Sequence, residues 1–135
     1  MKKTITISLI SILGLHLLGI VYDLYHVIWW YDIPMHILGG AWVALFFFHF
    51  FYQTWHVVDL RKILFTLIIT LGFVVLVGVL WEFYEYLSDV YLLKIHPLGY
   101  APNPLTLPDT LKDLLDDLIG GAVASLILLF RIKKT

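Results

Sequence analysis

Three long apolar runs, each free of Asp, Glu, Lys and Arg, set the hydrophobic pattern of the chain. They cover residues 4–22, 33–58 and 63–81. A helix needs about 20 residues to cross the hydrocarbon core of a bilayer, so each run can span it. A fourth run at residues 118–130 is too short to span unless its helix begins earlier, near Thr110. That helix would then carry Asp113, Asp116 and Asp117 to membrane depth.

The pattern predicts an all-α polytopic membrane protein. We expect a four-transmembrane-helix bundle, formed as a single transmembrane domain over residues 1–135, with helices at about residues 4–26, 33–57, 62–88 and 109–132. The composition agrees, because 61% of the residues are hydrophobic, only 14% are charged and the mean hydropathy is +0.90. Such a composition leaves too little polar surface for a soluble domain. The first run is long for a secretory signal and no A-x-A-like site follows it, so we expect a retained helix.

The distribution of basic residues predicts the orientation in the membrane. Lysines and arginines gather at the N-terminus, in the second loop and at the C-terminus, whereas all of the ten acidic residues except Asp59 lie in or beside the first and third loops. Basic loops stay cytoplasmic. The sequence therefore predicts a multi-pass protein of the cell membrane with both termini inside and its acidic face toward the extracytoplasmic side.

The third loop, residues 88–108, contains four prolines and also several apolar residues. Long loops of this kind are usually functional or disordered. We expect an extracytoplasmic lid over the bundle mouth, and a hairpin lying on the lipid surface is the alternative. Thr106 followed by Asp109 is typical of a helix start with an acid in the first turn.

The two halves of the sequence resemble each other at their polar positions. Asp23-x-x-His26 in the first expected helix matches Glu82-x-x-Glu85 in the third at a shift of 59 residues. In the same way, Asp32-x-x-x-His36 and the glycine pair that follows it match Asp113-x-x-x-Asp117 and its glycine pair at a shift of 81. We infer two helical-hairpin repeats related by a pseudo-twofold axis along the membrane normal. The glycine pairs predict close approach of the two helices that carry them.

Spacings of three and four place each polar pair on one helical face near the outer end of its helix. Ionisable groups inside a membrane are costly, and such positions are functional candidates by default. A divalent cation bound among them would neutralise the most charge in the least space. The sequence therefore predicts a metal site with nine candidate ligands: His36, Glu82, Glu85, Asp113, Asp117, Asp32, Asp109, Asp23 and His26.

Carboxylate and imidazole ligands suit Zn, Mg, Mn, Ca or Fe, and the sequence does not rank these ions. No thiolate can take part, because the chain has no cysteine. Solvated groups at helix ends are an equally good interpretation of Asp23, His26 and Asp116. The lone imidazoles His16 and His49 more naturally form hydrogen bonds between helices.

The same motifs resemble those of a known family. Tyr31-Asp32-x-x-x-His36, Trp81-Glu82-x-x-Glu85 and Asp113-x-x-x-Asp117-x-x-Gly120 are similar to the signature of the YjdF-like (DUF2238) membrane proteins and of the wider VanZ-like group. The likeness covers the second, third and fourth expected helices. Asp117 departs from the VanZ-like pattern, where Asn is usual. The resemblance implies a prokaryotic envelope protein, and VanZ-like proteins are linked to glycopeptide resistance.

Three classes of function remain open at this point. The first is a metal-dependent hydrolase or transferase acting on a lipid-linked or envelope substrate, with Glu82 or Glu85 as general base. The second is a cation- or proton-binding transport or channel protein. The third is a non-catalytic VanZ-like envelope or antibiotic-resistance protein. The partner common to all three is the lipid bilayer, and the net charge of -1 gives no sign of nucleic-acid binding.

Overall fold

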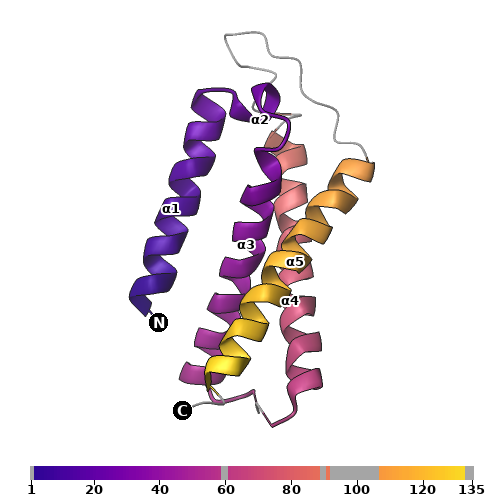
Figure 1. Cartoon of the computed structure of the whole chain (residues 1–135). Helices are drawn as coiled ribbons and strands as arrows, with labels where there is room; N and C mark the ends of the chain where they lie inside the picture. Colours follow the sequence, from indigo (N-terminus) through magenta and orange to yellow (C-terminus); the bar gives the residue numbers. More distant parts are fainter. Residues whose placement is uncertain (1, 59–60, 89–90, 92–106, 133–135) are drawn as a thin grey trace.

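The computed structural model describes residues 2–58, 61–88, 91 and 107–132. In this part of the chain every regular element is a helix: α1 (Lys2–Val21), α2 (Leu24–Val27), α3 (Asp32–Phe47), the π-helix η1 (Phe48–Thr54), α4 (Ile63–Leu87) and α5 (Leu107–Ile132). Helices α3, α4 and α5 pack together, and α1 lies beside α3 (Figure 1). The start of α1 and the end of α5 lie at one end of the bundle, opposite the start of α3.

Three of these helical segments are long and apolar enough to cross a membrane: Lys2–Val21, Asp32–Thr54 and Ile63–Leu87. Their outer faces carry exposed Leu, Ile, Val and Phe side chains, as expected of surfaces that lie against lipid. Helix α5 has 26 residues and is therefore about 39 Å long, but its first half is acidic. It begins at Leu107 and carries Asp113, Asp116 and Asp117 into the bundle, as the short fourth run required.

Two helices depart from the continuous segments that the sequence predicted. The first ends at Val21, and Asp23 then takes a left-handed conformation (φ 56°) before the short α2, so Asp23 lies in the break and His26 on α2, and neither is on the end of α1. The second changes from α to π geometry after Phe47. The apolar run continues past Phe47, and the spacing of three between Asp23 and His26 fits a helix, which is why the sequence pattern predicted unbroken helices.

Small residues set the distance between α3 and α5. A Cβ on Gly40 would overlap the backbone carbonyl of Asp117, and a Cβ on Gly120 would overlap the carbonyl of Ile37. The two backbones are therefore in direct contact, as the glycine pairs predicted. Helix α4 packs against both α3 and α5. Its buried residues recur every four positions along one face: Thr66, Thr70, Val74, Gly78 and Glu82.

The half of the bundle that holds the start of α1 and the end of α5, called the inner half after its expected orientation, has an apolar core, in contrast to the outer half at the start of α3. Phe47, Phe48 and Leu129 are buried together near the ends of α3 and α5, with Phe73 of α4 packed against them. His49 is buried here, and its Nδ1 lies 3.0 Å from Oε1 of Gln53 in the same helix, so the described residues show a bond within one helix and not the expected bond between helices. The buried carboxylates of the described residues are thus all at the outer end, whereas the inner half has the buried hydroxyl groups of Thr66, Thr70 and Ser125.

Two sequence predictions keep their status as predictions. The proposed lid at residues 88–108 lies almost wholly outside the described residues, as does Thr106, the expected start of the last helix. The repeat is unconfirmed. α4 packs closely on both α3 and α5, whereas its expected counterpart α1 packs mainly on α3.

The glycine contact gives a direct prediction about stability. Gly40→Ala and Gly120→Ala should each destabilise the fold by about 1–3 kcal/mol, because the added methyl group forces two backbones apart. Gly14→Ala and Gly72→Ala are matched controls, since a Cβ at either position meets nothing within 4 Å. Thermal unfolding in detergent would measure the difference. Equal unfolding temperatures for all four variants would contradict the proposed role of the backbone contact between α3 and α5.

Candidate metal centre

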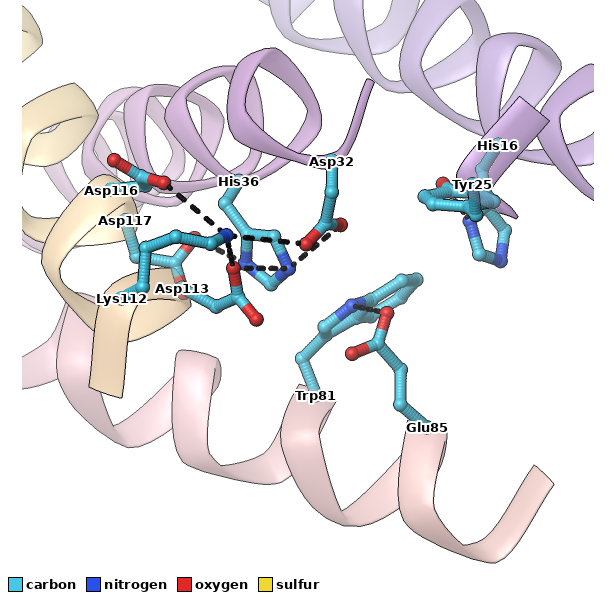
Figure 2. Close-up of polar contacts among 10 residues, drawn as sticks. All are labelled: His16, Tyr25, Asp32, His36, Trp81, Glu85, Lys112, Asp113, Asp116 and Asp117. Carbon is cyan, nitrogen blue, oxygen red and sulfur yellow. Dashed lines mark hydrogen bonds and ion pairs between the residues drawn. The ribbon is translucent and has the colours of Figure 1, made fainter. Parts of the chain in front are cut away.

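His36 lies at the centre of the polar outer end and is only 4% exposed. Its Nε2 is 3.4 Å from a carboxylate oxygen of Asp32, one turn earlier on α3, and 4.0 Å from one of Asp113 on α5. Its Nδ1 is 3.5 Å from a carboxylate oxygen of Asp117 (Figure 2). The two ring nitrogens therefore face different carboxylates, which fixes the orientation of the ring.

Two overlapping groups of side chains have the geometry to hold a metal ion. Asp32, His36 and Glu85 form one, and His36, Glu82 and Asp113 form the other, with ligand atoms within 4.8 Å of one another in each group. Both groups draw on more than one helix and share His36. The donors are carboxylate oxygens and an imidazole nitrogen, the set that Mg, Mn, Ca, Zn and non-haem iron accept.

Several carboxylate oxygens at this end of the bundle lack a hydrogen-bond partner. Glu82 is 7% exposed, and neither of its oxygens has a hydrogen-bond partner at normal bonding geometry within the described part of the chain, although the side chain of Thr110 on α5 lies near it. One oxygen of Asp117 also has no hydrogen-bond partner among the described residues. It lies beside Gly78, and a Cβ at position 78 would overlap it. Buried carboxylates left this way are unfavourable unless a proton, water or a cation satisfies them.

Lys112 supplies a positive charge that the sequence pattern did not assign to the site. Its ammonium group donates a hydrogen bond to Asp113 and lies 3.5 Å from an oxygen of Asp32 and 3.8 Å from one of Asp116. Asp116 is 8% exposed, so its interpretation as a solvated helix-end group was wrong. The spacing of four between Lys112 and Asp116 was the available signal for this pair.

A second set of contacts extends from the site toward α1. The indole N–H of Trp81 donates a 2.8 Å hydrogen bond to Glu85, which holds that carboxylate in place. The ring of Trp81 packs against His16 of α1, and Nδ1 of His16 lies 2.7 Å from the hydroxyl of Tyr25. The His16 bond joins α1 to α2, as expected for a lone imidazole in an apolar helix.

Four of the nine predicted ligands belong to neither group. Asp23 and His26 pair with each other at 2.6 Å and are partly exposed, which fits the alternative interpretation of solvated groups. Asp109 lies in the first turn of α5, partly exposed and one turn before Asp113. Asp117 also lies outside the two groups but contacts His36 directly. Helices α3, α4 and α5 thus bring together the remaining predicted residues.

The Lys112 network predicts an energetic coupling that double substitution can measure. Lys112→Met should destabilise the metal-free protein by about 1–3 kcal/mol, because it leaves the buried carboxylate of Asp113 without its hydrogen-bond donor. We expect a value toward the lower end of this range, because Lys112 is 41% exposed and solvent weakens its ion pairs. Adding Asp113→Asn should recover most of that loss. Unfolding in detergent with a chelator present measures both, and Lys112→Arg is the charge-preserving control. Strictly additive effects would contradict the coupling.

Comparison with known proteins places the chain in a family but gives no close relative of known structure. No curated protein and no solved structure matches it. One family model matches the chain over residues 1–134, which is nearly its whole length. The family is described as a predicted membrane protein. The polar motifs on α3, α4 and α5 that suggested the resemblance all lie inside the matched range. The chain belongs to the DUF2238 family of predicted membrane proteins.

Proposed function

We propose that this protein binds a divalent metal ion at the outer end of its helix bundle and uses the ion to hydrolyse or transfer a lipid-linked or envelope substrate. The observation that carries the proposal is the convergence of His36 with carboxylates from α4 and α5, among them Glu82, which is buried and lacks a hydrogen-bond partner. A divalent cation satisfies such groups without the entry of bulk water. Ionisable clusters at membrane depth are functional candidates for the same reason.

The contacts of His36 suggest which residues would have which role. Nε2 faces the candidate ligands Asp32 and Asp113 and is the natural metal donor, whereas Nδ1 faces Asp117. Histidine ligands commonly donate their second ring N–H to a carboxylate, which fixes the tautomer and strengthens the ligand. Asp117 is therefore assigned to orient His36.

Each group offers three protein ligands, which leaves coordination positions for water or substrate, as in catalytic metal sites. When bound, the ion would activate water or polarise the substrate. If Asp32, His36 and Glu85 hold the ion, Glu82 stays buried nearby without a partner and is suited to accept a proton as general base. Trp81 would keep Glu85 oriented toward the ion.

The transport alternative has weaker support. A permeation route needs polar groups across the whole bundle. In the described inner half, the buried centre contains Phe47, Phe48 and Leu129. The buried polar residues there are His49, Thr66, Thr70 and Ser125, none of them a carboxylate, and the hydroxyls of Thr70 and Ser125 donate to backbone carbonyls of their own helices. A site open to one side of the membrane fits this asymmetry better.

We also propose that α5 is a fourth span and that both termini are cytoplasmic. Since the chain contains no native cysteine, single cysteines can report the topology. In intact cells, Trp29→Cys, in the exposed segment between α2 and α3, should react with a membrane-impermeant maleimide, and Arg61→Cys should react only after permeabilisation. The reverse pattern would overturn the orientation.

Metal analysis of the purified protein tests the main proposal. We expect one equivalent of a divalent ion in the wild type, loss of binding in His36→Ala, and a roughly 10- to 100-fold weaker affinity in Asp117→Asn. Loss of binding in Glu85→Gln but not in Glu82→Gln assigns the ion to the group of Asp32, His36 and Glu85, and the opposite result assigns it to the group of His36, Glu82 and Asp113. His49→Ala is the matched control, because this histidine is also buried but lies at the inner end of the bundle. Elemental analysis and competitive titration with a chelating dye measure these effects. A wild-type protein without metal, and without affinity for any of the five candidate ions, would refute the proposal.

A further inference from the structure

A cavity of about 160 Å³ lies between α1, α3 and α4, directly beside the candidate metal centre. Its polar end is formed by Asp32, His36, Glu85 and Asp117, and its walls are mostly apolar side chains such as Ile12. The cavity follows the helix axes, since its lining on α4 runs from Val74 to Glu85, which is about 16 Å of helix. It is therefore an elongated apolar space with acidic and imidazole groups at one end.

The cavity distinguishes between the two groups of candidate ligands. All three members of the Asp32, His36 and Glu85 group line it, whereas Glu82 and Asp113 do not. An ion held by the first group would therefore present its open coordination positions to the cavity. Any molecule that completes the coordination must also place apolar atoms along the walls.

His16 adds a hydrogen-bond donor to the polar end. The Tyr25 hydroxyl lies 2.7 Å from Nδ1 of His16 and can donate a hydrogen bond to it. In the tautomer in which Nδ1 accepts that bond, the imidazole hydrogen is on Nε2, a buried atom without a hydrogen-bond partner among the described residues. His16 lines the cavity, so this N–H is available to an oxygen atom of a bound molecule.

We propose that the cavity holds part of an acyl chain of a phosphate-bearing membrane lipid, whose phosphate group reaches the metal ion. The inference rests on the proposed metal site. A lipid fits because the walls are apolar and belong to helices whose outer faces are exposed to the bilayer, as at Leu13. A phosphate fits because ions bound by carboxylates favour anionic oxygen ligands, and His16 and Lys112 add a donor and a positive charge nearby.

The size of the cavity limits what it can hold. A dry cavity of about 150 Å³ accommodates benzene, so this one accommodates roughly six carbon atoms of a chain. The rest of the lipid would remain in the bilayer beside α1, which packs mainly on α3 (Figure 1). The proposed substrate is thus selected by its phosphate and one chain segment.

Photolabelling of the full-length protein in nanodiscs tests the proposal. The probes are phosphatidic acid and diacylglycerol with the same photoreactive acyl chain, and labelled peptides are identified by mass spectrometry. We expect labelling of α1, α3 and α4 at the cavity, at least fivefold stronger for phosphatidic acid, and a loss of that preference when a chelator or His36→Ala removes the metal.

Cavity-filling variants separate binding in the cavity from general contact with lipid. Val77→Trp should reduce cavity labelling at least fivefold with metal content unchanged, and Ile12→Trp on α1 should do the same as an independent variant. Leu76→Trp is the matched control, because Leu76 is adjacent to Val77 in the sequence but is 56% exposed. This variant should change neither the cavity labelling nor the metal content.

The two proposals can fail separately in this experiment. Normal metal content with no cavity labelling, or with equal labelling in Val77→Trp, would overturn the lipid inference and leave the metal site standing. Cavity labelling that is the same for both probes in a protein without metal would overturn the phosphate interaction together with the metal site. Stronger labelling by a photoreactive phosphatidylethanolamine that survives chelation would show that the acidic groups bind an amine, which also overturns the inference.

Discussion

The direct backbone contact between α3 and α5 is the constraint on which the polar site depends. With glycine at positions 40 and 120, the helices lie close enough for His36 to stand between Asp32 of its own helix and Asp113 and Asp117 of the other. Larger residues would move the carboxylates away from both ring nitrogens. The site therefore follows from backbone packing, and the ion pairs form within a distance that the glycines have already set.

The sequence predicted the elements that follow from apolar periodicity and from the high cost of charge in lipid. These include the three long apolar helices, the acidic start of α5, and the meeting of His36 with carboxylates from two other helices. The cost argument succeeds because a carboxylate inside a span has few alternatives to another polar group. It needs no knowledge of how the helices cross.

Other features were not predictable from the same pattern. The break at Asp23 depends on one left-handed residue, and the π-helix after Phe47 preserves the apolar run that the periodicity follows. Lys112 was counted only as one of the few basic residues on the acidic side, since its position relative to Asp32 depends on how α3 and α5 cross. The cavity beside α1 likewise depends on tertiary packing, which spacing along one helix does not encode.

The balance of charge is the last step that links the site to its proposed occupant. Six carboxylates converge at this end of the bundle: Asp32, Glu82, Glu85, Asp113, Asp116 and Asp117. Lys112 is the nearby lysine in the described structure, and its ammonium group is already shared among three of these carboxylates, while Glu82 remains without a partner. A metal ion would supply the missing positive charge on the side where Asp32 and Glu85 face the apolar cavity. The same ion would then attract an anionic lipid group to a cluster that, without it, would repel one.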